Sequence, residues 1–239
     1  MFNPAKSGIT YFGRWKPSMC LYMYGDLVSN TNTVTDLGVT YSDLTFTEHA
    51  NKVVSDCKRL TGFVLRNFYT PEARLAVYKI CIRPKLEYCG HLYSSFKSAD
   101  RKKVESVQRF LTKRILGYDQ QIEYLDRCIR LDLEPLWLRR VKCNLFLLFK
   151  VIRKHCNSNS SITWANPKSY GLRNHNCLLK VNTHKLTTRA NFFTIKYCKL
   201  WNQLTPEIRS CERPDSFKRS LEKHINMSTL ALLNDLNCW

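Results

Sequence analysis

The sequence predicts a mainly α-helical protein with a small antiparallel β-sheet at its amino end, an α+β fold. Short apolar runs separated by turn residues fill the first 44 positions, as in a small sheet. From Thr45 onward the apolar residues recur at the spacing of amphipathic helices. With 239 residues, 44% of them hydrophobic, the chain can bury a core. We expect four segments: short strands over 1–44, a helical domain over 45–156, a basic extended linker over 157–190 and a helical segment over 191–239.

Three short strands are expected at the amino end. They cover residues 9–12, 19–24 and 34–41, with a turn at Gly25-Asp26 after the second strand. A sheet this small presents unpaired edges. We therefore expect it to be the edge of a larger assembly.

Two helices are expected after the strands. The first begins at a capping threonine, Thr45 or Thr47, and runs to about Phe68. The second begins at Thr70, which is followed at once by a proline in the first helical position. Pro84 lacks an amide hydrogen, so it must kink or end this second helix.

A helix over residues 99–116 divides most clearly into two faces. Asp100 is expected to cap its start, and Gly117 stands where a glycine ends many helices. One face is apolar and predicted to meet the core: Val104, Val107, Leu111 and Ile115. The opposite face is basic: Lys102, Arg109 and Lys113.

A long helix over residues 134–155 repeats this division, after a short helix over 124–133. Its core face is expected to contain Leu136, Val141, Leu145 or Leu148, and Ile152. Its basic face contains Arg139, Lys142 and Lys150. Two such helices predict a groove that binds nucleic acid. The alternative is that each basic face is only solvated surface, with any affinity coming from Lys180, Lys185 and Arg189.

The carboxyl-terminal third is expected to return to helix. The linker over 157–190 is polar and basic, with few apolar residues. A helix over 191–202 follows, with Phe193, Tyr197 and Leu200 or Trp201 on one face, and Pro206 is expected to end it. A last short helix is predicted over 216–225.

The charge of the chain indicates a polyanionic partner. Lys and Arg total 38 against 19 acidic residues, a formal net charge of +19. Twelve Tyr and five Trp accompany these cations, which favours nucleic acid (RNA, DNA or a hybrid duplex) over a membrane surface. The longest apolar run, 144–149, is far too short to cross a bilayer. No apolar leader opens the chain, so we expect an intracellular protein, nuclear or cytoplasmic.

The sequence contains no recognisable set of catalytic or metal-binding residues. Paired metal ions need clustered carboxylates, and only Asp132 and Glu134 stand close enough to consider. Since that pair precedes the long helix, we expect it to stabilise the helix start. The eleven cysteines are scattered singly, as in reduced thiols, and their spacing to histidine matches no regular zinc motif. No cofactor, no metal and no enzymatic activity are expected.

Several short motifs, taken in order, resemble a known family. They are Phe2-Asn-Pro-Ala-Lys6, Tyr11-Phe-Gly-Arg14, Asp36-Leu-Gly-Val39, Ile82-Arg-Pro-Lys-Leu-Glu-Tyr88, Glu105-Ser-Val-Gln-Arg109, Leu138-Arg-Arg140, Trp201-Asn-Gln-Leu204 and Ser216-Phe-Lys218. Their order and spacing resemble the carboxyl-terminal part of reverse transcriptases (RNA-directed DNA polymerases) from non-LTR, LINE-type, jockey-like retrotransposons.

The resemblance implies a remnant consisting of the last palm strands, a helical thumb and a basic carboxyl-terminal region. The family's catalytic aspartate pair is absent from this chain. Lys6 matches a family lysine that follows the catalytic turn, but without partners it is better interpreted as a loop lysine. The implied function is non-catalytic, sequence-independent binding of the nucleic-acid backbone by a truncated, thumb-like protein. The alternatives are a helical protein–protein interaction module, with a complementing polymerase chain as partner, and an inactive pseudogene product.

Overall fold

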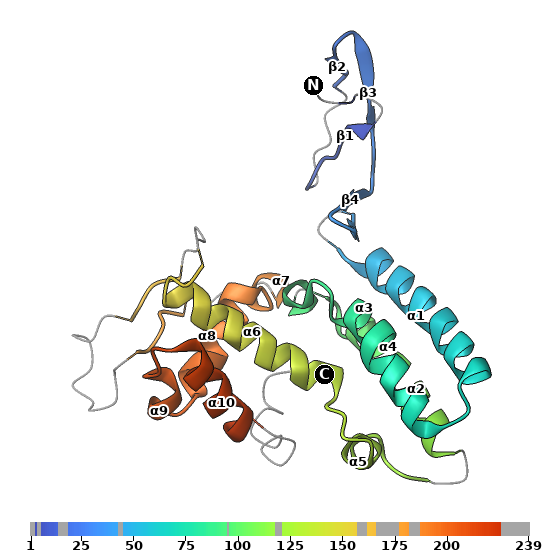
Figure 1. The fold of residues 1–239 in the computed structure, drawn as a ribbon. Coiled ribbons are helices and arrows are strands. Elements are labelled where there is room, and N and C mark those ends of the chain that lie inside the picture. Colours follow the sequence, from blue (N-terminus) through green and yellow to red (C-terminus); the bar gives the residue numbers. More distant parts are fainter. Residues whose placement is uncertain are drawn as a thin grey trace.

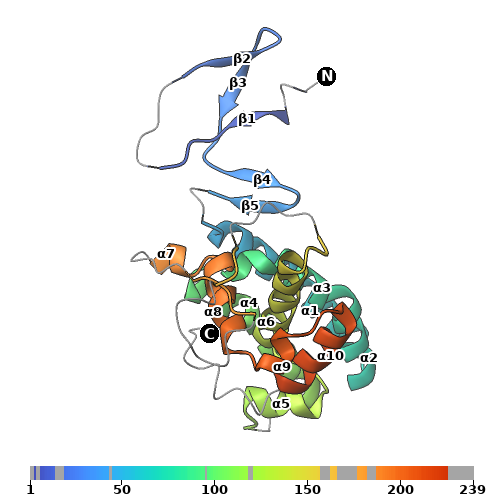
Figure 2. The same ribbon diagram turned by 90° about the vertical axis from the view of Figure 1, so that its left-hand side faces the viewer.

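The computed structural model describes residues 3, 6–13, 19–42, 45–94, 96–117, 121–156, 162–165, 177–181 and 187–225. The protein is mainly helical, with small β-sheets confined to the amino end, so the predicted fold class is confirmed. Figures 1 and 2 show these strands projecting from one end of a helical body. The helical body contains every other described element.

The first sheet has three strands in the spatial order β1-β3-β2. They are β1 (Gly8–Ile9), β2 (Leu21–Met23) and β3 (Asp26–Asn30). β2 and β3 are antiparallel, as predicted, whereas β1 runs parallel to β3, so this sheet is mixed. The sequence pattern missed β3, and the turn falls one residue earlier than expected, so Asp26 belongs to the strand. Tyr24 and Gly25 both have positive φ, and β3 begins immediately after them.

The expected strand over 34–41 is in fact a separate hairpin of two strands. β4 (Val34–Asp36) and β5 (Val39–Tyr41) pair antiparallel around Leu37 and Gly38. Both turn residues have positive φ, of 46° and 82°, as a tight two-residue turn requires. Tyr88 Oη donates a hydrogen bond to the Leu37 carbonyl at 2.6 Å, which connects the hairpin to the helical body.

The first two helices lie where they were predicted, and only α1 differs at its start. α1 (Thr47–Asn67) begins without a side-chain cap, and the Thr47 hydroxyl instead donates to Asp100 at 2.7 Å. α2 (Pro71–Val77) is capped by Thr70, whose hydroxyl accepts from the Ala73 amide at 3.2 Å. Helix α2 ends well before Pro84. A π-helical turn, η2 (Tyr78–Ile82), and α3 (Arg83–Glu87) continue the path and place the proline in a first turn, where its missing donor is harmless.

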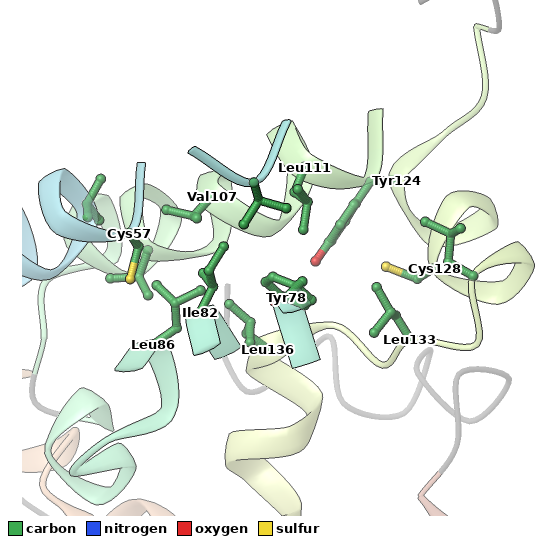
Figure 3. Close-up of a cluster of buried hydrophobic side chains, with 14 of the residues drawn as sticks. Cys57, Tyr78, Ile82, Leu86, Val107, Leu111, Tyr124, Cys128, Leu133 and Leu136 are labelled. Atoms are coloured by element: carbon green, nitrogen blue, oxygen red, sulfur yellow. The ribbon is translucent and has the colours of Figure 1, made fainter. Parts of the chain in front are cut away.

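The central helix α4 (Ser98–Leu116) packs against α1 and buries its predicted apolar face. All four predicted core residues are at most 6% exposed: Val104, Val107, Leu111 and Ile115. Asp100 is not the cap but a buried residue of the first turn, after Lys97 at the N-cap. Figure 3 shows Tyr78, Ile82 and Leu136 against the Val107–Leu111 side of α4 in this first core.

A second core forms around α6 (Leu136–Ile152). It packs against α8 (Phe193–Gln203) and α10 (Pro214–His224), and the ring centroids of Phe149 and Phe217 lie 4.3 Å apart. Leu136 belongs to the first core and its neighbour Trp137 to the second. Helix α6 therefore contributes side chains to both cores.

Three shorter helices complete the described chain. They are α5 (Tyr124–Arg130), α7 (Thr187–Ala190) and α9 (Pro206–Arg209). Of the predicted extended linker, Trp164 and Leu179 form an antiparallel bridge, whereas α7 shows that the segment ends in helix. α8 ends at Gln203 as expected, and Pro206 begins α9. Linker residues 157–161, 166–176 and 182–186, and the chain after 225, lie outside the described residues.

Candidate nucleic-acid interface

Three predicted cations of α4 lie on its exposed side. Lys102, Arg109 and Lys113 are all exposed, and the helix rises by roughly 17 Å from the first to the last. Within the described residues, neither Lys102 nor Arg109 forms an ion pair. The Arg109 guanidinium lies 4.5 Å from the ring centroid of Tyr124, which holds it against α5 while leaving its charge available. We call these three residues the α4 stripe.

The predicted cations of α6 have other contacts. Arg139 forms ion pairs with Glu87 and, at 3.8 Å, with Glu134. Lys142 forms a close ion pair with Glu134. The Lys150 ammonium lies 4.7 Å from the ring centroid of Phe146. Arg139 and Lys142 line a separate depression next to α10. The structure therefore does not bring the six predicted residues together in one groove.

A cavity of about 430 Å³ adjoins the α4 stripe instead. Its walls come from η3 (Gly90–Ser94), α4, α6 and α8. Five cationic residues line it: Arg101, Lys102, Arg109, Arg140 and Lys196. Trp137, Tyr197 and Val141 supply an apolar wall. We call this space the basic cavity.

Among the described residues, Glu105 is the one carboxylate that lines the basic cavity, and its charge is directed into the protein. Its oxygens accept hydrogen bonds from the α6 amides of Leu136, at 3.0 Å, and Trp137, at 3.2 Å. The hydroxyl of Tyr124 donates to the same carboxylate. Burial, followed by the charge of Glu105, raises the pKa of Tyr124 well above its usual range, so it stays a neutral donor. Glu105 thus caps α6 from another helix and leaves the cavity cationic.

This arrangement corrects the interpretation of Asp132 and Glu134. Neither residue caps α6: Asp132 lies in a turn with φ of 46°, and Glu134 pairs with Arg139 and Lys142. No side chain at the N-cap position of α6, Pro135, can accept a hydrogen bond. The amides at that end therefore need an acceptor from elsewhere in the fold, and Glu105 provides it.

Arg140 is the most deeply placed cation of the basic cavity. It is 7% exposed, and its guanidinium lies 4.2 Å from the ring centroid of Tyr93. One of its terminal nitrogens donates to the Leu86 carbonyl at 3.2 Å. Within the described residues, its Nε and the Tyr93 hydroxyl are both buried without a hydrogen-bond partner. A buried cation of this kind needs an anion or further acceptors nearby.

The sequence patterns did not predict three of the cations that line the basic cavity. Arg140 and Lys196 are 7% exposed, and both occur on helices whose patterns place charge at the surface. Arg101 stands next to Lys102 but points toward η3, where it donates to the Ser94 carbonyl at 3.4 Å. The one available signal was Leu138-Arg-Arg140, a motif that carries the family resemblance.

The described residues give little evidence for a metal site, a reactive cysteine or a membrane-spanning helix. No group of three or more His, Cys, Asp or Glu side chains there could hold a metal ion. The ten described cysteines are all free, and burial raises the pKa of Cys57 and Cys198 to about 11, which makes them poor nucleophiles. None of the helices described is both long and apolar enough to cross a membrane.

No protein-family model matches the chain, and searches of curated proteins and of solved structures found no similar protein. A functional proposal must therefore start from the arrangement of side chains described above.

Proposed function

We propose that this protein binds the backbone of nucleic acid without sequence preference and catalyses no reaction. The observation that carries the proposal is the α4 stripe, three exposed cations that follow one side of a single helix. The partner is RNA, DNA or a hybrid duplex.

Phosphate contacts are the interaction that this surface suits best. Lys102, Arg109 and Lys113 are long exposed side chains along one side of a rigid helix that the first core holds in place. Such cations bind phosphates by charge and carry no information about base sequence. The charge of +19 adds a general attraction that speeds the encounter with a polyanion.

The retrotransposon resemblance supports the same function. It implies a truncated reverse-transcriptase-like remnant in which palm-edge strands precede a helical thumb, and a thumb holds the template–product duplex through its backbone. The arrangement of small sheets followed by a helical body is compatible with that origin. No catalysis is proposed because the sequence lacks the paired aspartates that hold polymerase metal ions.

A double charge reversal tests the proposal. Arg109→Glu with Lys113→Glu should weaken binding to duplex DNA and to RNA–DNA hybrid similarly, whatever their sequence. Each lost phosphate contact should reduce the slope of log affinity against log salt by roughly 0.7 to 0.9. A filter-binding titration at several salt concentrations measures both effects.

Two control variants separate this surface from other sources of charge. Arg139→Gln with Lys142→Gln also removes two cations, but both are ion-paired away from the stripe, so binding should be unchanged. Alanine at Lys180, Lys185 and Arg189 tests the alternative in which the linker supplies the affinity. If that variant loses binding and the α4 reversal keeps it, the proposed interface is wrong.

A protein–protein interaction module is the second candidate, and the amino-terminal strands favour it. Large apolar side chains there are strongly exposed: Leu21 45%, Tyr22 68%, Tyr24 65%, Leu27 59% and Leu37 83%. Exposed apolar groups gathered on the small amino-terminal sheets are typical of surfaces that meet a partner. The two functions are compatible, since the strands lie at the end of the helical body (Figure 2).

A further inference from the structure

The basic cavity has the size and depth of a small-molecule site rather than of a duplex-binding surface. Its volume of about 430 Å³ lies within the range of roughly 300 to 1,000 Å³ that ligand pockets occupy. A double helix cannot enter a hollow of this size, whereas one nucleotide can. The cavity therefore calls for a ligand different from the backbone that the α4 stripe contacts.

The charge of the cavity specifies the ligand's chemistry. In the described part of the chain, five cations and one carboxylate line it, a formal balance of +4, and that carboxylate is occupied by the α6 amides and Tyr124. Arg140 and Lys196 are each 7% exposed, so water screens them poorly. A phosphate monoester carries a charge near −2 at pH 7 and three acceptor oxygens, which match such a site better than a diester's single charge.

The remaining walls suit the nucleoside that the phosphate would carry. Trp137, Val141 and Tyr197 line the apolar side of the cavity. The Asn144 amide fixes Tyr197 by donating to its hydroxyl at 2.8 Å. The Arg140 guanidinium lies 4.2 Å from the ring centroid of Tyr93, so aromatic and cationic side chains stand together in the cavity lining.

We propose that the basic cavity binds a single nucleotide through its phosphate monoester. The nucleotide comes either from the phosphorylated end of a strand lying on the α4 stripe or from solution. Lys102 and Arg109 belong to both surfaces, so a strand bound along the stripe can reach the cavity with its end. The strand-end form rests on the proposed function, whereas binding of a free nucleotide does not.

Paired oligonucleotides test the site in the full chain. Fluorescently labelled 12-nucleotide strands, identical except for a 5′-phosphate or a 5′-hydroxyl, are titrated by anisotropy, with 3′-phosphorylated strands as a further pair. The wild type should bind one phosphorylated form about tenfold more tightly than its hydroxyl counterpart, as expected for added hydrogen bonds between charged groups. Lowering the pH from 7.5 to 5.5 should shrink this preference, because a monoester loses charge near pH 6.

Two substitutions locate the effect. Lys196→Gln should abolish the preference for the phosphate while changing affinity for the hydroxyl strand by less than about twofold, because Lys196 is outside the stripe. Lys113→Gln, on the stripe and outside the cavity lining, should weaken both strands and keep their ratio. Thermal unfolding checks that each variant folds. If Lys196→Gln is unstable, Arg101→Gln at the cavity rim takes its place.

Adenosine monophosphate and inorganic phosphate distinguish the two sources of the nucleotide. Calorimetric binding of the monophosphate to wild type, lost in Lys196→Gln, supports the site for a free nucleotide even if no strand binds. A phosphate preference without monophosphate binding supports the strand-end form. Strands that bind through the stripe without any end preference, together with no binding of the monophosphate, overturn the cavity site and leave the proposed function intact.

Discussion

Glu105 Oε1 lies 3.0 Å from the backbone nitrogen of Leu136, so a buried carboxylate of α4 caps the start of α6. Leu136 and Trp137 are also the point where the two cores meet. The same carboxylate accepts from Tyr124, which ties α5 to the junction. One side chain thus fixes the relative position of three helices at the wall of the basic cavity.

Substituting Glu105 should destabilise the protein more than any surface carboxylate. Glu105→Gln replaces charge-assisted hydrogen bonds by weaker ones and should lower the free energy of unfolding by about 1.5–3 kcal/mol. Asp56→Asn, which breaks the exposed pair with Arg59, should lower it by less than about 1 kcal/mol. Urea denaturation followed by circular dichroism compares the two. Equal losses in both variants would show that the helix cap contributes little.

The apolar face of α4 should tolerate no charge. Val107 is completely buried, so Val107→Asp places an unpaired carboxylate in the first core and should cost several kcal/mol. Phe110 is 42% exposed on the same helix, and Phe110→Asp should cost about 1 kcal/mol or less. Thermal melts of both variants measure the difference. A native-like melting temperature for Val107→Asp would contradict the described packing of α4.

The ion pairs of α6 should matter for stability and not for binding. Arg139→Gln leaves the half-buried Glu87 without its main partner. It should lower the free energy of unfolding by about 1 kcal/mol. Adding Glu87→Gln should recover part of that loss, since the pair is then removed as a unit. Affinity for nucleic acid should stay within twofold of wild type in both. If these variants lost as much affinity for nucleic acid as the Arg109/Lys113 reversal does, Arg139 would have to belong to the interface.

Burial of His49 should make stability depend on pH. Its pKa is lowered from 6.5, first by burial and then by the charge of Lys52. The unfolded chain therefore takes up the proton more readily. His49 contributes its full stability above pH 6.5, and the contribution is lost as the pH falls below that value. His49→Gln, which does not titrate, should show a smaller decrease in unfolding free energy between pH 7 and pH 5. An identical decrease would exclude His49 as a cause.

The amino-terminal sheet should promote self-association. Tyr22 and Leu27 pair directly across β2 and β3, and both are more than half exposed. β1 and β2 are also edge strands, with backbone groups available to a second chain. Tyr22→Lys with Leu27→Glu should raise the monomer fraction in sedimentation experiments. Phe63→Lys, at an exposed position of α1, serves as the control and should change nothing. A wild type that is monomeric at high concentration would argue against a partner surface here.

The sequence alone determined the features that depend on near neighbours. The periodicity of α4 predicted its four buried residues and its exposed Lys102, Arg109 and Lys113, because helical spacing directly decides which side chains share a face. The Thr70 cap and the turn at Gly25 also followed from local chemistry.

Only the tertiary structure decided what those faces meet. Arg139 and Lys142 have the same helical pattern as the α4 stripe, yet Glu87 and Glu134 neutralise them. Arg140 and Lys196 are 56 positions apart in the sequence but line one cavity. The charge balance of a site is a sum over side chains that the fold brings together from distant positions. Periodicity along a single helix contains no information about that sum.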